Sequence, residues 1–198
     1  GSEMCIRDST TGVVERDEIL GPERIAEGDA LIAVASSGLH SNGYSLVRHV
    51  LLEQAGWTLD RHVDELGRTV GEELLEPTIV YAADLLALTH HSEVHAMCHV
   101  TGGGLANNLA RVMPSHLTAT IERSTWSPAP IFRLVQKVGS VSQSDIEETL
   151  NMGVGMVIAL PVSQVSDALE FLAGRGLTAW QCGCLLYTSP SPRDRQKS

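Results

Sequence analysis

"ALIAVASSGLHSNGYSLVR" (30–48) joins an unbroken apolar run to an amphipathic one through a polar turn that contains two glycines. The apolar run at 30–36 has no polar alternation, which predicts a strand buried on both faces. Beyond the turn, the apolar residues of 46–51 recur at helical spacing, and Asn42 is placed to cap that helix. The stretch therefore predicts a strand, a polar corner and a helix, which is the repeating unit of an α/β domain.

Strands and helices alternate along the rest of the chain in the same way. The apolar pattern predicts further strands at 94–100, 117–122, 155–162 and 179–185. Helices are predicted from Pro77 to His90, from 105 to 113, at 130–139 and around 165–172. The strands at 94–100 and 117–122 alternate more cleanly than buried parallel strands do, so antiparallel or edge pairing is expected. The predicted fold is a three-layer α/β/α domain built on a mixed sheet.

The composition is that of an ordinary globular chain with an acidic surface. Of the 198 residues 43% are hydrophobic, and 14 basic against 24 acidic side chains give a net charge of −10. A negative surface repels nucleic acid and anionic membranes, so neither is an expected partner. No apolar run approaches the roughly 20 residues of a membrane span, and no signal peptide is visible. We therefore expect a cytoplasmic protein with reduced cysteines, in which an anionic ligand needs a local electropositive pocket.

The two ends of the chain differ in composition from the middle. Residues 1–10 show no apolar periodicity, and residues 185–198 are rich in serine, proline and charge. Both ends resemble translated linker DNA, and natural disordered tails are the alternative. We expect the folded domain to span 29–184 and the chain to be a piece of a longer protein.

A second glycine-rich corner follows the strand predicted at 94–100. In "HVTGGGLANNL" (99–109) a strand ends, three glycines follow and a helix begins. Glycines let a ligand approach the backbone, and a helix N-terminus offers free N–H groups, so this layout suits a phosphate. The sequence matches neither the P-loop pattern nor GxGxxG, because Asn107 replaces the last glycine. A tight strand-to-helix turn remains the alternative.

The opening corner has the same layout, and a third candidate lies further along the chain. Ser37, His40, Ser41 and Asn42 offer hydrogen bonds to a phosphate, ribose or amide, although a well-capped turn uses the same residue types. "NMGVGM" (151–156) precedes the strand predicted at 155–162, and its alternative is a bulge or bend. Several such corners in one domain favour a shared ligand pocket at the strand ends.

The sequence shows no pattern for a metal held by this chain alone. His95 and His99 share one face of a predicted strand but stand roughly 13 Å apart at ~3.3 Å per residue. No HExxH motif, no Cys/His cluster and no GxSxG nucleophile elbow occurs. We predict no metal site, and the catalytic residues stay unknown at this point.

Taken together in this order, the three corners resemble the C-terminal domain of the phosphoribosylformylglycinamidine cyclo-ligases, also called aminoimidazole ribonucleotide synthetases. "TGVVERDEIL" (11–20) resembles the end of their N-terminal domain and the interdomain linker, which would occupy 11–28. The resemblance implies ATP-dependent closure of the imidazole ring of formylglycinamidine ribonucleotide in purine biosynthesis. In that reaction ATP phosphorylates an amide oxygen, a neighbouring nitrogen attacks that carbon and phosphate leaves.

The resemblance also implies partners and site residues. ATP and Mg²⁺ would be bound mostly by an N-terminal half that is not in this sequence and that pairs the subunits into a homodimer, so the fragment alone would be inactive. The implied substrate contacts, with the third corner the weakest group, are Ser37, Gly38, His40, Ser41, Asn42, Gly43, Thr101, Gly102, Gly103, Gly104, Asn151, Gly153 and Gly155.

One departure and several alternatives accompany the resemblance. Relatives often carry an arginine where "PTIVY" (77–81) has Ile79, which puts an anion contact there in doubt. Other enzymes of the superfamily would share the architecture: formylglycinamidine ribonucleotide synthetase, thiamine-phosphate kinase, selenophosphate synthetase and the hydrogenase maturation factor. A module that binds a phosphorylated ligand without catalysis is the alternative of a different class.

Overall fold

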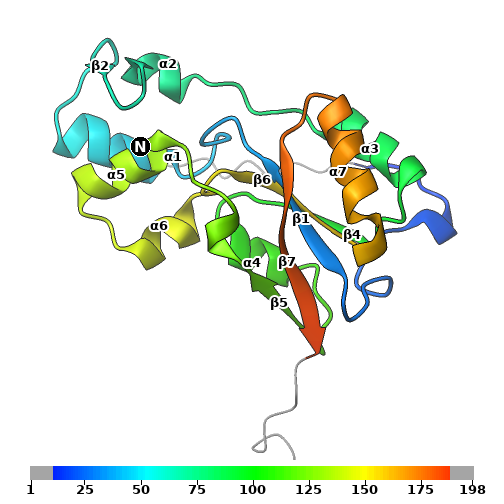
Figure 1. Ribbon diagram of the computed structural model, residues 1–198. Helices are drawn as coiled ribbons and strands as arrows, with labels where there is room; N and C mark the ends of the chain where they lie inside the picture. The colour runs from blue at the N-terminus through cyan, green and yellow to red at the C-terminus, as the bar shows by residue number, and fades with distance from the viewer. Residues whose placement is uncertain (1–10, 188–198) are drawn as a thin grey trace, which may run out of the picture.

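The computed structural model describes residues 11–187, so the expectations for 1–10 and 188–198 lie outside the described residues. A five-stranded sheet in the order β4-β6-β1-β7-β5 forms the centre of the molecule (Figure 1). Every neighbouring pair is antiparallel, so the α/β class is confirmed, but the sheet is antiparallel throughout and not mixed. The strands are β1 (Ala30–Ala35), β4 (Ala96–His99), β5 (Leu117–Ile121), β6 (Val154–Leu160) and β7 (Ala179–Tyr187).

The two strands with alternating sequences lie at the two edges of the sheet. β4 and β5 each have a single neighbour, β6 and β7 respectively. An edge strand has one well-covered face, and this explains why their sequences alternate while the central strand β1 is apolar throughout. Leu31 and Ala33 of β1 face one side of the sheet and Ile32 and Val34 face the other, all fully buried.

Helices pack on both sides of this sheet, as the predicted layers require. α3 and α7 cover the face of Ile32, and α4 covers the face of Leu31. The helices and single turns are η1 (Arg16–Glu18), α1 (Tyr44–Arg48), η2 (His49–Gln54, a π-helical segment), α2 (Val70–Leu74), α3 (Ala82–His91), α4 (Gly104–Ala110), η3 (Arg123–Thr125), α5 (Pro130–Gly139), α6 (Gln143–Thr149), η4 (Val162–Gln164) and α7 (Val165–Gly174).

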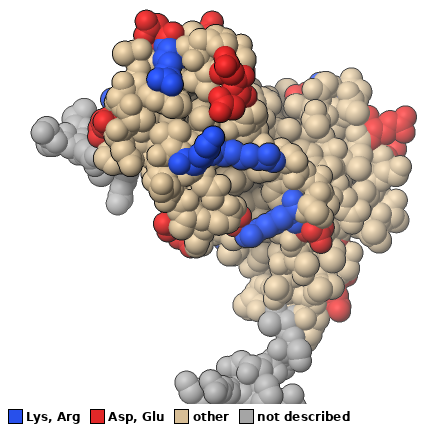
Figure 2. Space-filling view, turned by 60° about the vertical axis from the view of Figure 1, so that its left-hand side comes forward, with Lys and Arg blue, Asp and Glu red and all other residues tan. Residues whose placement is uncertain are grey.

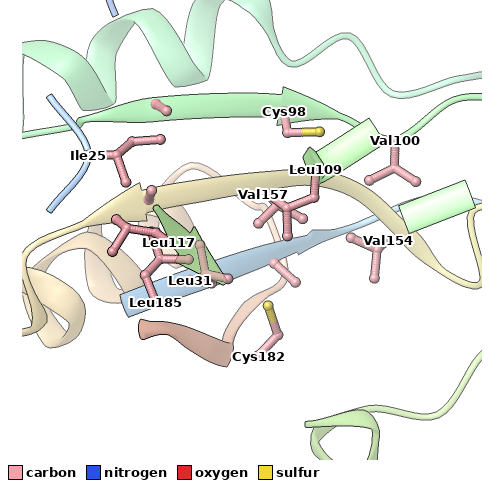
Figure 3. Close-up of a cluster of buried hydrophobic side chains, with 13 residues drawn as sticks. Ile25, Leu31, Cys98, Val100, Leu109, Leu117, Val154, Val157, Cys182 and Leu185 are labelled. Atoms are coloured by element: carbon pink, nitrogen blue, oxygen red, sulfur yellow. The ribbon is translucent and has the colours of Figure 1, made fainter. Parts of the chain in front are cut away.

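The cluster on the α4 side is dry and apolar (Figure 3). Leu31, Val157 and Leu185 from three adjacent strands pack there with Leu109 of α4. Cys98 and Cys182 are buried in the same cluster as free thiols. Burial raises the pKa of Cys98 to about 11 and that of Cys182 to about 12.

A second group of helices extends from one end of the sheet, at the left of Figure 1. α1, η2, α5 and α6 share an apolar cluster of their own, into which α5 directs Ile131, Phe132, Leu134 and Val135. This helical lobe also contains α2 and the two-stranded hairpin β2 (His62–Val63) and β3 (Arg68–Thr69), none of which the sequence pattern predicted. Such short elements carry too few apolar positions to establish a period.

Several predicted boundaries differ from the structure. The helix predicted at 105–113 ends at Ala110, and the strand predicted at 94–100 spans Ala96–His99. The helix predicted from Pro77 begins at Ala82, because 77–81 forms no regular secondary structure and hydrogen-bonds the first corner instead. The residue that caps α1 is Gly43, with φ 69°, and the Asn42 side chain is used elsewhere. β7 runs to Tyr187, past the expected domain end at 184, since its last residues pair with β5. No helix among residues 11–187 is long and apolar enough to cross a bilayer.

Candidate functional site

The three glycine-rich corners meet at one end of the sheet. β1 and β4 end where β6 begins, because β6 runs antiparallel to both. The Ser36 N–H donates to the Gly153 carbonyl at 2.9 Å, and the Val100 N–H donates to the Gly155 carbonyl at 2.9 Å. Corners that are distant in the sequence are therefore neighbours, as the hypothesis of a shared pocket requires.

The first corner is a left-handed turn held by Asn42. His40 and Ser41 have φ of 53° and 58°, a conformation that costs a non-glycine residue about 1–2 kcal/mol. The Asn42 side-chain amide donates to the His40 carbonyl at 2.7 Å, and its oxygen accepts from the Gly102 N–H at 3.0 Å. Asn42 thus stabilises the strained turn and joins the first corner to the second.

In the second corner the three glycines have different surroundings. A Cβ on Gly104 would lie 1.8 Å from the carbonyl oxygen of Glu147 in α6, so this glycine is required for close packing. A Cβ on Gly102 or Gly103 would meet nothing closer than 3.7 Å. The Gly103 N–H has no hydrogen-bond partner within residues 11–187. Gly102 and Gly103 therefore form the open part of this corner.

Thr101 and Asn108 fix the shape of that corner from below. The Thr101 hydroxyl donates to Asn108 Oδ1 at 3.1 Å, and Asn108 Nδ2 donates to the Gly104 carbonyl at 2.7 Å. Asn108 is buried. Among the residues implied by the resemblance, Thr101 is thus engaged within the protein, while the glycines beside it present backbone.

The third corner is closed on itself. Asn151 is fully buried, and its Nδ2 donates to the Gly38 carbonyl at 2.9 Å. Its Oδ1 accepts from the Gly153 N–H at 2.8 Å and from the Ser36 hydroxyl at 3.2 Å. The Asn151 side chain makes bonds only inside the protein, and it connects the third corner to the first.

Two further glycines of the expected set also serve packing. A Cβ on Gly43 would lie 2.1 Å from a methyl carbon of Leu150, and one on Gly155 would lie 2.0 Å from the hydroxyl of Tyr81. Both positions need a residue without a side chain because another side chain occupies the space. Shape rather than ligand contact explains these two glycines.

Among the corner residues, His40 has a buried side-chain atom without a hydrogen-bond partner within residues 11–187, as do Ser92 and Trp180 elsewhere. The His40 ring is buried, and the N–H groups of Ser37 (3.0 Å) and Ile79 (3.3 Å) both point at Nε2. Because Nε2 accepts, the bonding pattern assigns the neutral tautomer with the proton on Nδ1. Burial lowers the pKa of His40, and the nearby His99 lowers it further. Nδ1 has no partner within residues 11–187, so a neutral donor is left for another acceptor.

Sequence reasoning missed the role of segment 77–81, which has no regular secondary structure and which we call the strap segment. It hydrogen-bonds the first corner along its length. The contacts are Ser37 Oγ donating to the Pro77 carbonyl at 2.6 Å, Ser41 Oγ with Thr78 Oγ1 at 3.3 Å, the Ile79 N–H to His40, and Tyr81 Oη to the Ala35 carbonyl at 2.6 Å. Ile79 contacts His40 through its backbone, so the absence of an arginine side chain leaves this contact intact. The signal was present in the β-branched residues after Pro77, which favour extended chain.

The charges beside the first corner are partly compensated. The position of a Cβ on Gly38 lies 3.8 Å from Glu76 and 3.9 Å from Glu73. Arg68 pairs with Glu76 at 2.5 Å and with Glu73 at 2.6 Å, and these bonds raise the pKa of Arg68. The carboxylates therefore repel an approaching anion less than isolated ones would.

Basic side chains lie on the surface of the helical lobe, interspersed with acidic ones (Figure 2). Figure 2, which brings the side of the helical lobe forward, shows Lys and Arg side chains running across that surface. Arg133 and Lys137 of α5 line a hollow of about 600 Å³ there. None of the residues that line this hollow belongs to the three corners, whose two unpaired donors are neutral.

A hollow of about 790 Å³ lies beside α4, β5 and α6, and it is lined mainly by apolar side chains such as Leu105, Met113 and Trp126. Its charged residues, Arg123 and Glu147, pair with each other. It contains none of the residues expected at the site. Convergent polar groups distinguish a reaction site from an apolar groove, and those are found at the corners.

The described residues do not fit Mg²⁺ at the corners. No group of three or more His, Cys, Asp or Glu side chains between residues 11 and 187 is arranged to hold a metal ion. His95 pairs with Asp29 at 2.7 Å and with Glu93 at 3.4 Å, which is a structural use of this histidine. The donors at the corners, an amide N–H and a neutral imidazole N–H, fit the oxygens of a phosphate or sugar instead.

Comparison with known proteins identifies the family. A profile described as "AIR synthase related protein, C-terminal domain" matches residues 26–186. The chain belongs to this family. The match covers all five strands of the AIR synthase-related sheet almost completely, and it includes the three corners and the strap segment.

Relatives of this AIR synthase-related chain have one name in common. A Streptomyces fradiae protein named as a phosphoribosylformylglycinamidine cyclo-ligase is 62% identical over 159 residues, which are 80% of this chain and 87% of that protein. The phosphoribosylformylglycinamidine cyclo-ligase of Geotalea daltonii is 39% identical over 183 residues, 92% of this chain and 53% of that protein. Apart from the Streptomyces protein, the chain spans about half the length of these curated relatives.

Solved structures confirm the fold. Thiamine-monophosphate kinase from Stenotrophomonas maltophilia superposes with a TM-score of 0.61 at 16% identity, over 89% of this chain and 53% of that one. Hydrogenase maturation protein HypE in complex with ATP superposes with a TM-score of 0.52 at 17% identity, over 89% of this chain and 48% of that one. At these identities the similarity establishes a shared architecture and no more.

Proposed function

We propose that this chain supplies the C-terminal wall of the active site of a phosphoribosylformylglycinamidine cyclo-ligase, the ATP-dependent ligase that closes the imidazole ring of formylglycinamidine ribonucleotide. The observation that carries the proposal is the meeting of three corners at one end of the sheet, with two neutral donors left unpaired. These donors are the Gly103 N–H and Nδ1–H of His40. The names of the relatives support the reaction class.

The proposed task of this wall is to hold the ribonucleotide. ATP, when bound, supplies the phosphoryl group that activates the amide oxygen of the substrate. The chain's own residues supply position and hydrogen bonds, because ring closure needs the attacking nitrogen close to an activated carbon. His40 Nδ1–H and the Gly103 N–H are the proposed donors to oxygen acceptors of the substrate, and Gly102 leaves the space beside them open. Ser37, Ser41 and Asn42 line the approach.

The other expected residues are proposed to shape the wall rather than to touch the ligand. Gly38, Gly43, Gly104, Asn151, Gly153 and Gly155 all lie at packing or internally bonded positions. Most ATP contacts, the Mg²⁺ ligands and a subunit contact that makes a homodimer are proposed to lie in the additional half of the longer relatives. The chain alone is then inactive, and the complete enzyme works in the cytoplasm.

Calorimetry on a hybrid protein tests the proposal. The N-terminal half of the Geotalea daltonii enzyme is joined to this chain, and binding of formylglycinamidine ribonucleotide is measured. His40→Ala is expected to weaken binding about tenfold, the effect of losing one good hydrogen bond of about 1.4 kcal/mol. Gly103→Val is expected to weaken binding for a different reason, because a side chain at this φ of 105° is strained and displaces the backbone N–H from its position. Ser166→Ala, at an exposed position of α7 on the opposite face of the sheet from α4, is the control. Unchanged affinity in both site variants would contradict the proposal.

A further inference from the structure

Tyr81 lies where β1, the strap segment and His40 meet. Its hydroxyl donates to the carbonyl of Ala35, the last residue of β1, at 2.6 Å. The pairing of β1 with β6 shifts register between Val34 and Ala35, so this carbonyl lies at an irregular point of the sheet. Tyr81 is buried, and burial raises its pKa far above the usual range, which keeps the hydroxyl a donor.

Gly155 is shaped around this tyrosine. A Cβ there would lie 2.0 Å from Tyr81 Oη and 2.7 Å from Cζ. The φ of Gly155 is not in the left-handed region, so its backbone alone does not require glycine. The need for glycine comes from the tyrosine ring. A residue counted among the expected site positions thus serves to place Tyr81.

The tyrosine ring stands between two imidazoles. Its centroid is 5.9 Å from that of His40 and 6.4 Å from that of His99, both at tilted or edge-on angles. The strap segment that ends at Tyr81 also carries the Ile79 N–H that points at His40 Nε2. One short segment therefore covers the His40 ring and fixes its accepting nitrogen.

We propose that Tyr81 is a positioning residue of the substrate site. Its hydroxyl fixes the carbonyl of Ala35, after which the first corner begins. Its ring keeps His40 buried, so that Nε2 accepts from the N–H groups of Ser37 and Ile79. Nδ1–H is then directed to an oxygen acceptor of the ligand. The identity of the ligand rests on the proposed function, but the arrangement of His40 is a property of the chain without ligand.

The titratable groups around His40 are few. His99 faces it from β4 and acts on its charge state. Glu73 and Glu76 lie beside Gly38 on the opposite side of the corner, and both are paired with Arg68. Replacing Tyr81 by Phe removes a hydroxyl but none of these charged groups. A change in the tautomer or titration midpoint of His40 therefore reports on Tyr81 itself.

Nuclear magnetic resonance of the histidine side chains tests this role. The 198-residue chain is labelled with ¹⁵N at histidine, and long-range proton–nitrogen spectra are recorded across the acid pH range. The unchanged chain should show His40 as the Nδ1–H tautomer, titrating below the ordinary value of about 6.5. In Tyr81→Phe the titration midpoint should move toward the ordinary value and the second tautomer should become visible.

Tyr44→Phe is the matched control. Tyr44 Oη donates to the Leu74 carbonyl at 2.6 Å, so this variant also loses a tyrosine-to-carbonyl hydrogen bond but lies away from the tyrosine–histidine contact. His40 should keep its tautomer and midpoint in Tyr44→Phe. If Tyr81→Phe, like Tyr44→Phe, leaves the tautomer and the titration midpoint of His40 unchanged, the positioning role is wrong.

A second test uses Gly155→Ala alone and together with Tyr81→Phe, in case the single variant Tyr81→Phe does not fold. Gly155→Ala should displace the tyrosine ring and change His40 in the same direction as Tyr81→Phe. In the double variant the hydroxyl that meets the new Cβ is gone, so the effects should be smaller than additive. Strictly additive effects would overturn the direct coupling of Gly155, Tyr81 and His40.

Failure of this inference is distinguishable from failure of the proposed function. In the hybrid protein, Tyr81→Phe is expected to weaken ribonucleotide binding about fivefold, somewhat less than loss of His40 itself. If Tyr81→Phe shifts the titration midpoint of His40 but the hybrid does not bind the ribonucleotide, the proposed function is contradicted and the positioning role stands. If Tyr81→Phe leaves the titration midpoint of His40 unchanged and the hybrid binds normally, only the positioning role is overturned.

Discussion

The corner at 101–104 and the corner at 151–155 look alike in the sequence, but the structure uses them in opposite ways. Both have polar and glycine residues next to a strand, and both contain left-handed glycines. At the second corner of the site the Gly103 N–H is unpaired within the described residues. At the third corner the Asn151 side chain makes only internal bonds. The comparison shows that bonding state, not composition, separates a corner that can bind from a corner that only holds shape.

The cause of the difference lies in what surrounds each corner. Asn151 is fully buried between the ends of β1 and β6, where an unpaired amide would cost roughly 1–3 kcal/mol. Gly103, whose N–H is the unpaired group, is partly exposed, so water or a ligand can satisfy that N–H. Variants on the two sides of the comparison should therefore separate stability from binding.

The largest effect is expected at Gly104. Gly104→Ala places a Cβ against the carbonyl oxygen of Glu147, and its φ of 70° is strained for alanine. We expect the free energy of unfolding to fall by about 3 kcal/mol. Urea unfolding followed by circular dichroism measures this loss. Gly102→Ala, two residues away with open space around its Cβ, should stay within about 0.5 kcal/mol of the unchanged chain.

A somewhat smaller loss is expected for the closed corner. Asn151→Ala leaves the Gly38 carbonyl and the Gly153 N–H without their partner in a buried place. The free energy of unfolding should fall by about 2 kcal/mol. Asn107→Ala, which removes an exposed amide bonded to the Gly103 carbonyl, is the control by the same urea method. Equal effects of the two asparagine variants would show that the third corner is not more closed than the second.

Binding should respond at the open corner without a change in stability. In the hybrid protein, Gly102→Ala adds a methyl group where the ligand approaches the backbone, and ribonucleotide affinity should fall about tenfold, or about 1.4 kcal/mol. Isothermal calorimetry gives the affinity, and urea unfolding of the same sample gives the stability. A variant that lost stability but kept its affinity would reverse the assignment of the two corners.

The smallest effect is a pH dependence from His40. Burial lowers its pKa in the folded chain, so the unfolded chain takes up a proton first as the pH falls below about 6.5. The contribution of His40 to stability is complete above that pH and is lost as the pH falls toward the folded-state value, with a slope of at most about 1.4 kcal/mol per pH unit. Urea unfolding measured at about five pH values from pH 7.5 down into the acid range should show this slope. The variant His40→Leu should remove it. Substitution of the exposed His62 by asparagine should leave the slope in place.

The sequence predicted the strands and most long helices because their apolar residues repeat with a clear period. β1, β6 and α5 were expected within one or two residues of their observed bounds. The pairing direction of the sheet was not predictable, since alternation reports burial and not strand polarity. The strap segment was missed because Pro77 suits the first turn of a helix as well as an extended chain.

The composition of the site was predictable, but its division of labour was not. Glycine, serine and asparagine at strand ends indicated all three corners, and the structure brings them together. Which glycine packs against a side chain and which faces solvent depends on residues distant in sequence. Glu147 decides this for Gly104, and Tyr81 decides it for Gly155. No local pattern contains that information.

The central claim is that the open corner and His40 form one binding surface, and one measurement tests it most directly. The ¹⁵N-labelled chain is titrated with ribose 5-phosphate, and shifts are followed for the backbone amides and the histidine rings. The account predicts shifts at the amides of Gly102 and Gly103 and at the His40 ring, with the Asn151 side-chain amide unmoved. Shifts centred on the hollow beside α4, or absent from the open corner at saturating ligand, would contradict it.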